Sequence, residues 1–128
     1  MSLSGEAKPY SKSQQLARGP RRYRRKVASP KQWQALWAAK KGPCRVCSFR
    51  ATESAIDPHH LVFSGHGGDD VADNIVPICR QCHEALHNRA SAICRLLLRK
   101  LSDAEYAYMV ERGGEDYAER VYGIEYQR

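Results

Sequence analysis

Two pairs of cysteines have the Cys-x-x-Cys spacing of a metal-binding turn. Cys44 and Cys47 form the first pair, and Cys79 and Cys82 form the second after an interval of 31 residues. Each pair can present two thiolates from one tight turn, and two such turns complete a tetrahedron around Zn²⁺. Because four thiolates leave no open coordination position, the sequence predicts a structural zinc site. A redox pair or two unrelated thiol pairs are the alternatives, and Cys94 is predicted to be a buried helix residue.

Histidines are concentrated in the same part of the chain. All five lie within residues 44–88, where His59 and His60 are adjacent and His83 and His87 are four residues apart. A spacing of four places two side chains on one face of a helix. Neutral imidazoles bind transition metals and accept protons near pH 7, so this cluster indicates a metal-binding or catalytic site.

The order of these motifs resembles the HNH endonuclease family, which has the ββα-metal fold. The resemblance is carried by CRVC and then by DPHHLVFSGHGGDDVADNIVPICRQCHEALHN. As in that family, a histidine doublet is followed by a Gly-rich loop, by Asn74, and by a helical histidine pair. The flanking CxxC pairs are similar to the zinc-containing branch that is common in phages and prophages. The proline that usually follows the doublet is absent from Leu61-Val62-Phe63.

The resemblance implies a role for each of these residues. His60 would be the general base that takes a proton from water, and Asn74 would orient its imidazole or contact the metal instead. One divalent cation (Mg²⁺, Mn²⁺, Ni²⁺ or Zn²⁺) would be held by the other imidazoles. The implied catalytic residues are His60, Asn74, His59 and His83, and the implied ligands of the catalytic metal are His59, His83 and His87.

The implied reaction is hydrolysis of DNA phosphodiester bonds to 5′-phosphate and 3′-hydroxyl ends. One active site per chain predicts nicking by a monomer, and cutting both strands would need a homodimer or two nicks. Family members in phages point to DNA processing and to phage packaging proteins as partners. A zinc-stabilised nucleic-acid-binding module without turnover is the alternative function.

Positive charge is concentrated near the N-terminus. The chain has a net charge of +7, and residues 1–26 carry eight basic residues against one acidic residue, so the remainder is neutral. A neutral domain with a basic arm predicts a polyanionic partner, with double-stranded DNA favoured; a solubilising tail is the alternative. The predicted DNA contacts are Arg21, Arg22, Arg24, Arg25, Lys26, Arg45 and Arg80.

The elements that must position these residues form a small α+β domain. Residues 1–28 are predicted to be a flexible basic arm and residues 29–128 a single nuclease domain. Within that domain a helix is expected at 29–42, a zinc-stapled core at 44–100 and further helices at 101–128. The core is predicted to be a ββα-metal unit, in which a two-stranded antiparallel hairpin packs with one helix beside the structural zinc site.

Local signals fix several of the element boundaries. Ser29 with Gln32 and Ser102 with Glu105 form capping boxes, each of which predicts the start of a helix. Strands are expected near 56–61 and 74–78. A stripe of apolar residues, Ile93, Leu96, Leu97 and Leu101, is predicted to continue the helix that begins near Arg80.

Composition excludes other classes of protein. Hydrophobic residues make up 42% of the chain and charged residues 27%, values typical of a globular domain. No apolar run approaches the length of a membrane span, and the N-terminal residues lack the apolar core of a secretory signal. We therefore expect a cytoplasmic protein of a bacterial or phage-infected cell, in which the cysteines stay reduced rather than forming the disulfides of a secreted protein.

Overall fold

The computed structural model describes residues 24–50 and 55–128. In chain order the elements are the helix α2 (Pro30–Lys40), the strand β2 (Ile56–His60), the 3₁₀ turns η2 (Ser64–His66) and η3 (Ala72–Asn74), the strand β3 (Ile75–Cys79), the helices α3 (Arg80–His87), α4 (Ser91–Arg99) and α5 (Asp103–Gly113), and the π-helical turn η4 (Ala118–Tyr122). The predicted α+β class, with a two-stranded antiparallel sheet and several helices, is confirmed.

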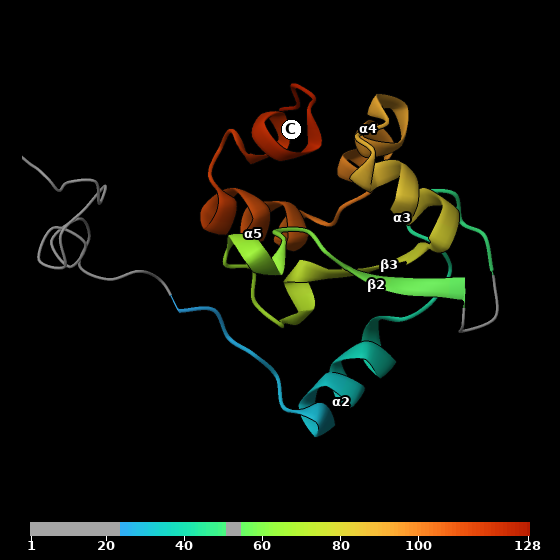
Figure 1. Cartoon of the computed structure of the whole chain (residues 1–128), viewed down its shortest axis with the longest axis vertical. Coiled ribbons are helices and arrows are strands. Elements are labelled where there is room, and N and C mark those ends of the chain that lie inside the picture. The colour runs from blue at the N-terminus through green and yellow to red at the C-terminus, as the bar shows by residue number, and fades with distance from the viewer. Residues whose placement is uncertain (1–23, 51–54) are drawn as a thin grey trace, which may run out of the picture.

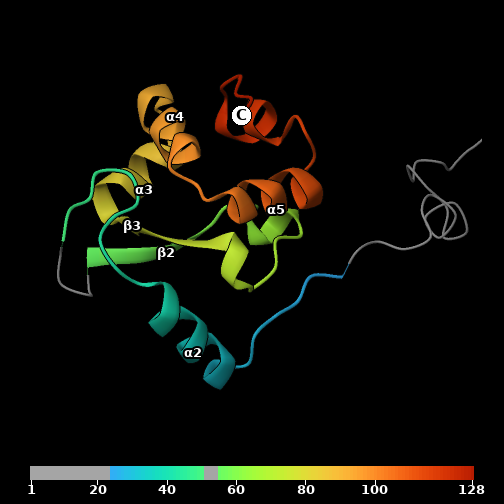
Figure 2. The ribbon, with the colours of Figure 1, turned by 180° about the vertical axis from the view of Figure 1, so that it is seen from behind.

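The hairpin is the centre of the fold. β2 and β3 pair in an antiparallel register that places Ile56 opposite Cys79 and His60 opposite Ile75. Both views of the ribbon show α2 on one side of the hairpin and α3 on the other (Figures 1 and 2). Every residue of β3 is buried. Because helices cover both faces, neighbouring side chains of one strand point into different environments.

Both predicted capping boxes are present. The Ser29 hydroxyl accepts a hydrogen bond from the Gln32 backbone N–H, and the Gln32 side chain accepts one from the Ser29 N–H. Ser102 and Glu105 make the same reciprocal pair at the start of α5. These bonds satisfy donors that the first turn of a helix leaves without intrahelical partners, which explains where both helices begin.

The prediction of one continuous helix from Arg80 through the apolar stripe is wrong. α3 ends at His87, and α4 begins at Ser91 after Arg89 adopts a positive φ of 58°. The apolar spacing continues across the break because both helices place their apolar faces against one core. Periodicity therefore identified the buried faces but not the change in backbone direction between them.

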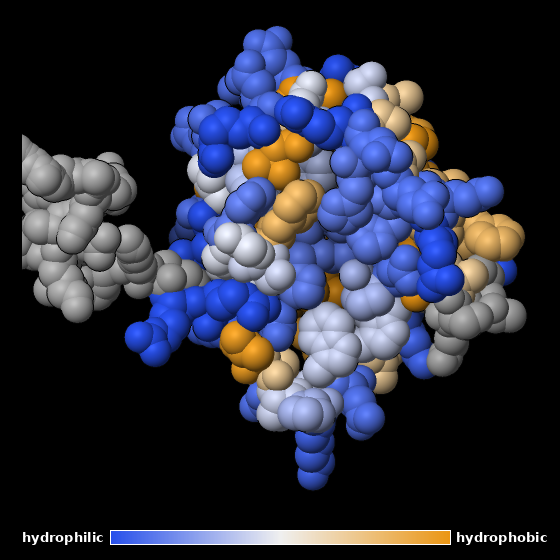
Figure 3. Space-filling view, viewed as in Figure 1, coloured by the Kyte–Doolittle hydropathy of each residue, from blue (hydrophilic) through white to orange (hydrophobic). Residues whose placement is uncertain are grey.

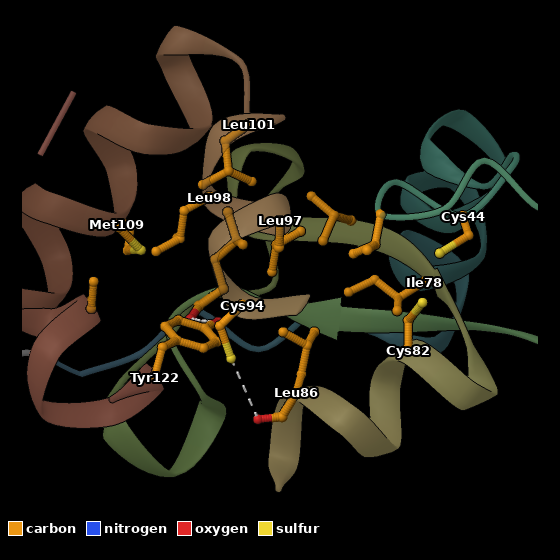
Figure 4. Close-up of a cluster of buried hydrophobic side chains, with 14 of the residues drawn as sticks. Cys44, Ile78, Cys82, Leu86, Cys94, Leu97, Leu98, Leu101, Met109 and Tyr122 are labelled. Atoms are coloured by element: carbon orange, nitrogen blue, oxygen red, sulfur yellow. Dashed lines mark hydrogen bonds between the residues drawn. The ribbon is translucent and has the colours of Figure 1, made fainter. Parts of the chain in front are cut away.

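One hydrophobic core connects the cysteines to the C-terminal elements. In Figure 4, Cys44 and Cys82 lie at one end of the cluster, and Met109 and Tyr122 lie toward the other. Cys94 is fully buried in α4, as predicted. The core therefore extends well beyond the hairpin and α3.

The surface is mainly hydrophilic. On the face shown in Figure 3, hydrophobic residues form small separate areas among hydrophilic ones. Within residues 24–50 and 55–128, no helix combines the length and the apolar character that crossing a bilayer requires.

A buried carboxylate joins α5 to the first cysteine turn and to α2. Glu105 is 2% exposed, and its oxygens accept hydrogen bonds from Lys40 Nζ at 2.7 Å and Arg45 at 2.6 Å. Burial by itself would raise the pKa of Glu105, but the bonds from Arg45 and Lys40 outweigh it and lower that pKa to about 2. Arg45 is therefore held by an internal ion pair.

We expect Glu105→Gln to reduce the free energy of unfolding at pH 7 by about 2 kcal/mol, because the ion pairs are lost while glutamine preserves the capping box. A lowered folded-state pKa stabilises the protein above the unfolded value, and this stabilisation fades as the pH falls from about 4.5 to about 2. Urea unfolding at pH 7 and at pH 3 measures the effect, which should be smaller at pH 3. Glu111→Gln, an exposed change on the same helix, is the control. Equal losses at both pH values for Glu105→Gln would contradict this prediction.

Candidate metal centre and catalytic site

Four cysteines converge as the sequence predicts. The Sγ atoms of Cys44, Cys47, Cys79 and Cys82 all lie within 4.8 Å of one another. Zn–S bonds of about 2.3 Å place tetrahedral sulfurs about 3.8 Å apart, and the Cys47 and Cys79 sulfurs are 3.8 Å apart. The donor set and its spacing are therefore consistent with a zinc site. Hydrogen bonds within the turns, from the Cys47 N–H to Cys44 Sγ and from the Cys82 N–H to Cys79 Sγ, orient the sulfurs.

Three histidines form a second cluster on the α3 side of the hairpin. One ring nitrogen from each of His59, His83 and His87 lies within 4.8 Å of the others. His83 and His87 are one helical turn apart on α3, and their Nε2 atoms are 3.1 Å apart. Nitrogen ligands at about 2.0–2.1 Å from one cation lie roughly 2.9–3.4 Å apart, depending on geometry. The helical pair is therefore spaced to share a cation, with His59 completing the set from β2.

Hydrogen bonds assign the nitrogens of two of these imidazoles. Tyr122 OH donates to the Leu61 carbonyl at 2.7 Å, so its oxygen accepts a bond from His59 Nε2 at 2.9 Å. His59 therefore keeps Nδ1 unprotonated. His83 uses Nδ1 to bond the Asp57 carboxylate at 3.1 Å, which leaves its Nε2 toward His87. Partners of this kind fix the tautomer and orientation of metal-binding imidazoles.

Burial keeps His59 in the form that can bind a cation. Its side chain is 2% exposed, and this burial, followed by the charges of the neighbouring imidazoles, holds the pKa of His59 well below its usual value. The pKa of His87 is lowered for the same two reasons. Neutral imidazoles are the ligand form of histidine, so the environment favours metal binding near neutral pH.

The cluster opens to solvent beside α3. A cleft of about 390 Å³ is lined by Asp57, Arg80, His83, Glu84, His87 and Asn88. Arg80 at its edge bonds Asp57 at 3.1 Å and, with His83, keeps the pKa of that carboxyl below its usual value. A substrate can therefore approach His83 and His87 from solvent, while His59 stays behind them.

His60 points to the other side of the hairpin. Its ring stacks on Trp33 of α2, with centroids 5.9 Å apart and planes 7° apart, and its Nε2 lies 2.8 Å from Asp70 Oδ1. The doublet is thus divided, with His59 facing α3 and His60 facing α2. Trp37 packs on the core, whereas Trp33 contacts His60.

Asn74 bonds the backbone of the loop and not the imidazole of His60, although orienting that imidazole was one of the two roles expected for it. Its fully buried amide accepts a bond from the Val62 N–H at 2.8 Å and donates to the carbonyls of Val62 and Asp69 at 3.1 and 3.0 Å. The imidazole of His60 is bonded by Asp70 instead. Asn74 therefore ties together the two ends of the loop between the strands.

Close backbone approach requires one glycine of this loop. A Cβ at Gly68 would lie 1.7 Å from the Val62 carbonyl oxygen and 2.8 Å from the Asn74 amide nitrogen. Only glycine fits between them. His66 is exposed in the same loop, where its Nδ1 contacts Tyr117 OH and its ring stacks on Phe63.

The predicted DNA contacts occupy varied positions. Arg25 pairs with Asp70, Arg45 with Glu105 and Arg80 with Asp57. Arg24 and Lys26 are exposed, whereas Arg21, Arg22 and the rest of residues 1–23 lie outside the described residues. Three of the arginines predicted to contact phosphates thus form ion pairs with carboxylates of the protein itself.

Sequence reasoning did not predict two partners of the histidines. Tyr122 reaches His59 from 63 positions further along the chain, and Asp70 bonds His60 from the Gly-rich loop. No local pattern marks Tyr122 as a partner of His59. The adjacency of His60 to a loop rich in aspartates was the only available signal for Asp70.

Residues 44–89 match the family model of HNH endonucleases. The match spans less than half of the chain and includes both cysteine pairs, the hairpin and α3. The match indicates that this segment is an HNH-type domain, a domain of nucleases for which DNA is the implied substrate. No curated protein matches the chain in sequence.

Proposed function

We propose that this protein is a metal-dependent endonuclease that hydrolyses DNA phosphodiester bonds. The observation that carries the proposal is the convergence of His59, His83 and His87 at an open cleft within the segment that matches the HNH model. We further propose that a monomer nicks one strand and leaves 5′-phosphate and 3′-hydroxyl ends.

His59, His83 and His87 would hold the catalytic cation. Three imidazole ligands favour Ni²⁺ or Zn²⁺ over Mg²⁺, with Mn²⁺ between them. When bound, such a cation supplies positive charge that stabilises the pentacovalent transition state and the departing 3′ oxygen. Asp57 and Tyr122 orient two of these ligands through the nitrogens that face away from the cation.

His60 is the proposed general base. Its side chain is 23% exposed, which leaves room for a water molecule beside the ring. A neutral imidazole can take a proton from that water as the oxygen attacks phosphorus. Because Nε2 is bonded to Asp70, Nδ1 is the nitrogen that accepts the proton.

Charge supports DNA as the partner. Residues 24–50 carry eight basic and no acidic side chains, and they include the whole of α2, which lies on the His60 side of the hairpin. Basic side chains on this surface would contact phosphates and add to the affinity for DNA. A role in phage DNA processing, in the cytoplasm of a bacterial or phage-infected cell, belongs to the same proposal. Phage packaging proteins are the proposed partners, and a homodimer would be needed only to cut both strands together.

Cleavage of supercoiled plasmid tests the proposal directly. Wild type should nick the plasmid after Mg²⁺, Mn²⁺, Ni²⁺ or Zn²⁺ is added and should be inactive in EDTA, while His60→Ala should lose at least about 100-fold in rate, the contribution typical of a general base. His66→Gln, an exposed histidine of the loop, is the matched control and should cleave at nearly the wild-type rate. If wild type binds DNA but cuts with none of these metals, the nuclease proposal fails and a binding module without turnover takes its place.

A further inference from the structure

Residues 25–28 form a strap that binds the loop before β3. The Arg25 guanidinium donates to the Gly68 carbonyl at 2.7 Å and to Asp70 Oδ1 at 2.7 Å. The Lys26 N–H donates to Asp69 Oδ1 at 2.7 Å, and the Lys26 carbonyl accepts from the Asp70 N–H at 2.9 Å. Side-chain and backbone bonds thus hold the strap to residues 68–70 along its length.

Asp70 is the centre of this contact. Its Oδ1 accepts hydrogen bonds from Arg25 and from His60 Nε2, and its Oδ2 accepts one from the Ala28 N–H at 2.9 Å. The side chain of Asp70 is only 11% exposed. Although burial opposes ionisation, the bonds from His60 and the Ala28 N–H keep the pKa of Asp70 below its usual value. The group is therefore a carboxylate that can only accept.

An acceptor at this position determines the tautomer of His60. The nitrogen that faces a carboxylate must carry a hydrogen, so His60 is protonated at Nε2 and has its lone pair at Nδ1. Trp33 stacks on the face of the same ring. Asp70 thus fixes the direction of the ring, and Trp33 fixes its plane. Both residues are connected to the strap, because Asp70 bonds the Ala28 N–H and the strap leads directly into the cap of α2, the helix that carries Trp33.

We infer that Asp70 is the positioning residue for His60 and that Arg25, from the strap, holds Asp70 in place. This inference rests on the proposed function, because it assigns His60 Nδ1 as the site of proton acceptance. It makes the segment before α2 a part of the active site as well as a part of the basic surface. Asp70 acts only through His60 and does not touch substrate.

Asp70→Asn tests the inference with two independent measurements. With its oxygen toward the Ala28 N–H, the amide of the variant can donate to Nε2 and so favours the opposite tautomer, with the hydrogen at Nδ1. Long-range ¹H–¹⁵N spectra of the metal-free full chain should show the hydrogen of His60 moving from Nε2 in wild type to Nδ1 in the variant. For a labelled duplex cleaved with the most active metal, kcat should fall by about 10²–10⁴ with KM within threefold, the scale seen when a base is held in the wrong tautomer.

Two further variants complete the test. Asp73→Asn, an exposed change in η3 of the same loop, should leave both the tautomer and kcat unchanged. Arg25→Gln should lower kcat by about 10-fold, because Asp70 loses the bond that holds it in place. The loss is smaller than in Asp70→Asn, since Asp70 keeps its bonds to His60 and Ala28. This variant also decides the question should Asp70→Asn fail to fold, since wild-type kcat in Arg25→Gln would then overturn the role of the strap.

The outcomes separate this inference from the proposed function. If Asp70→Asn keeps hydrogen at Nε2, or keeps kcat within threefold of wild type, Asp70 is not the positioning residue. If wild type cleaves with none of the metals, the proposed function fails, and the tautomer spectra alone then decide whether Asp70 orients His60.

Discussion

Cys44→Ser is expected to unfold the domain. Cys44 is 2% exposed at one end of the core, and its sulfur lies with three others in the cysteine cluster. Binding of structural zinc contributes on the order of 10 kcal/mol to folding, which is comparable to the whole stability of a small domain. Removing one thiolate therefore removes most of the metal-binding free energy that would hold the first cysteine turn to the start of α3. Thermal unfolding, with zinc content measured on the same sample, should show no cooperative transition near that of wild type.

Cys94→Ser provides the matched control. This cysteine is equally buried but lies in α4, outside the cysteine cluster. Placing a hydroxyl there should cost about 1–3 kcal/mol and leave zinc binding unchanged. If Cys44→Ser melted at the wild-type temperature with a full complement of zinc, the structural role of the cysteine cluster would be refuted.

His83→Ala should abolish cleavage while leaving the fold intact. His83 is partly exposed at the cleft, and its loss removes one of the three imidazoles that would hold the catalytic cation. We expect the cleavage rate to fall by at least about 10³, which corresponds to about 4 kcal/mol of transition-state stabilisation. Metal analysis of protein dialysed against Ni²⁺ or Zn²⁺ should find two ions per chain in wild type and one in His83→Ala.

Gln81→Ala, another change on α3, is the control because its exposed side chain faces away from the core. It should bind two ions and cleave at the wild-type rate. Should His83→Ala retain two ions and full activity, the histidine cluster is not the catalytic metal site, whatever the cysteine cluster binds.

Short-range signals predicted the elements well. The capping boxes at Ser29 and Ser102 place the starts of α2 and α5, because each depends on residues three positions apart. The break between α3 and α4 was not predicted. No glycine or proline stands there, and Arg89 takes the left-handed conformation instead. The spacing of apolar residues predicts which face of a helix is buried, but it does not predict such a turn in the backbone.

In the candidate site, too, local features were predicted and tertiary contacts were not. Spacing predicted that His83 and His87 share a helix face, and the order of motifs predicted that His59 joins them. The partners of the imidazoles depend on tertiary packing. Tyr122 approaches His59 only because η4 packs against the core, and Asp70 reaches His60 only because the loop folds back over the strap.

The bond between Tyr122 and His59 has a consequence for the choice of fragments that can be cut from this protein. A fragment cut at the limits of the family match would end at residue 89, before α4, α5 and η4. It would expose the apolar side of Leu86 and leave the His59 imidazole without the hydroxyl that orients it. Fragments and fusion proteins built from this chain should therefore extend through η4 and begin before the strap at Arg25.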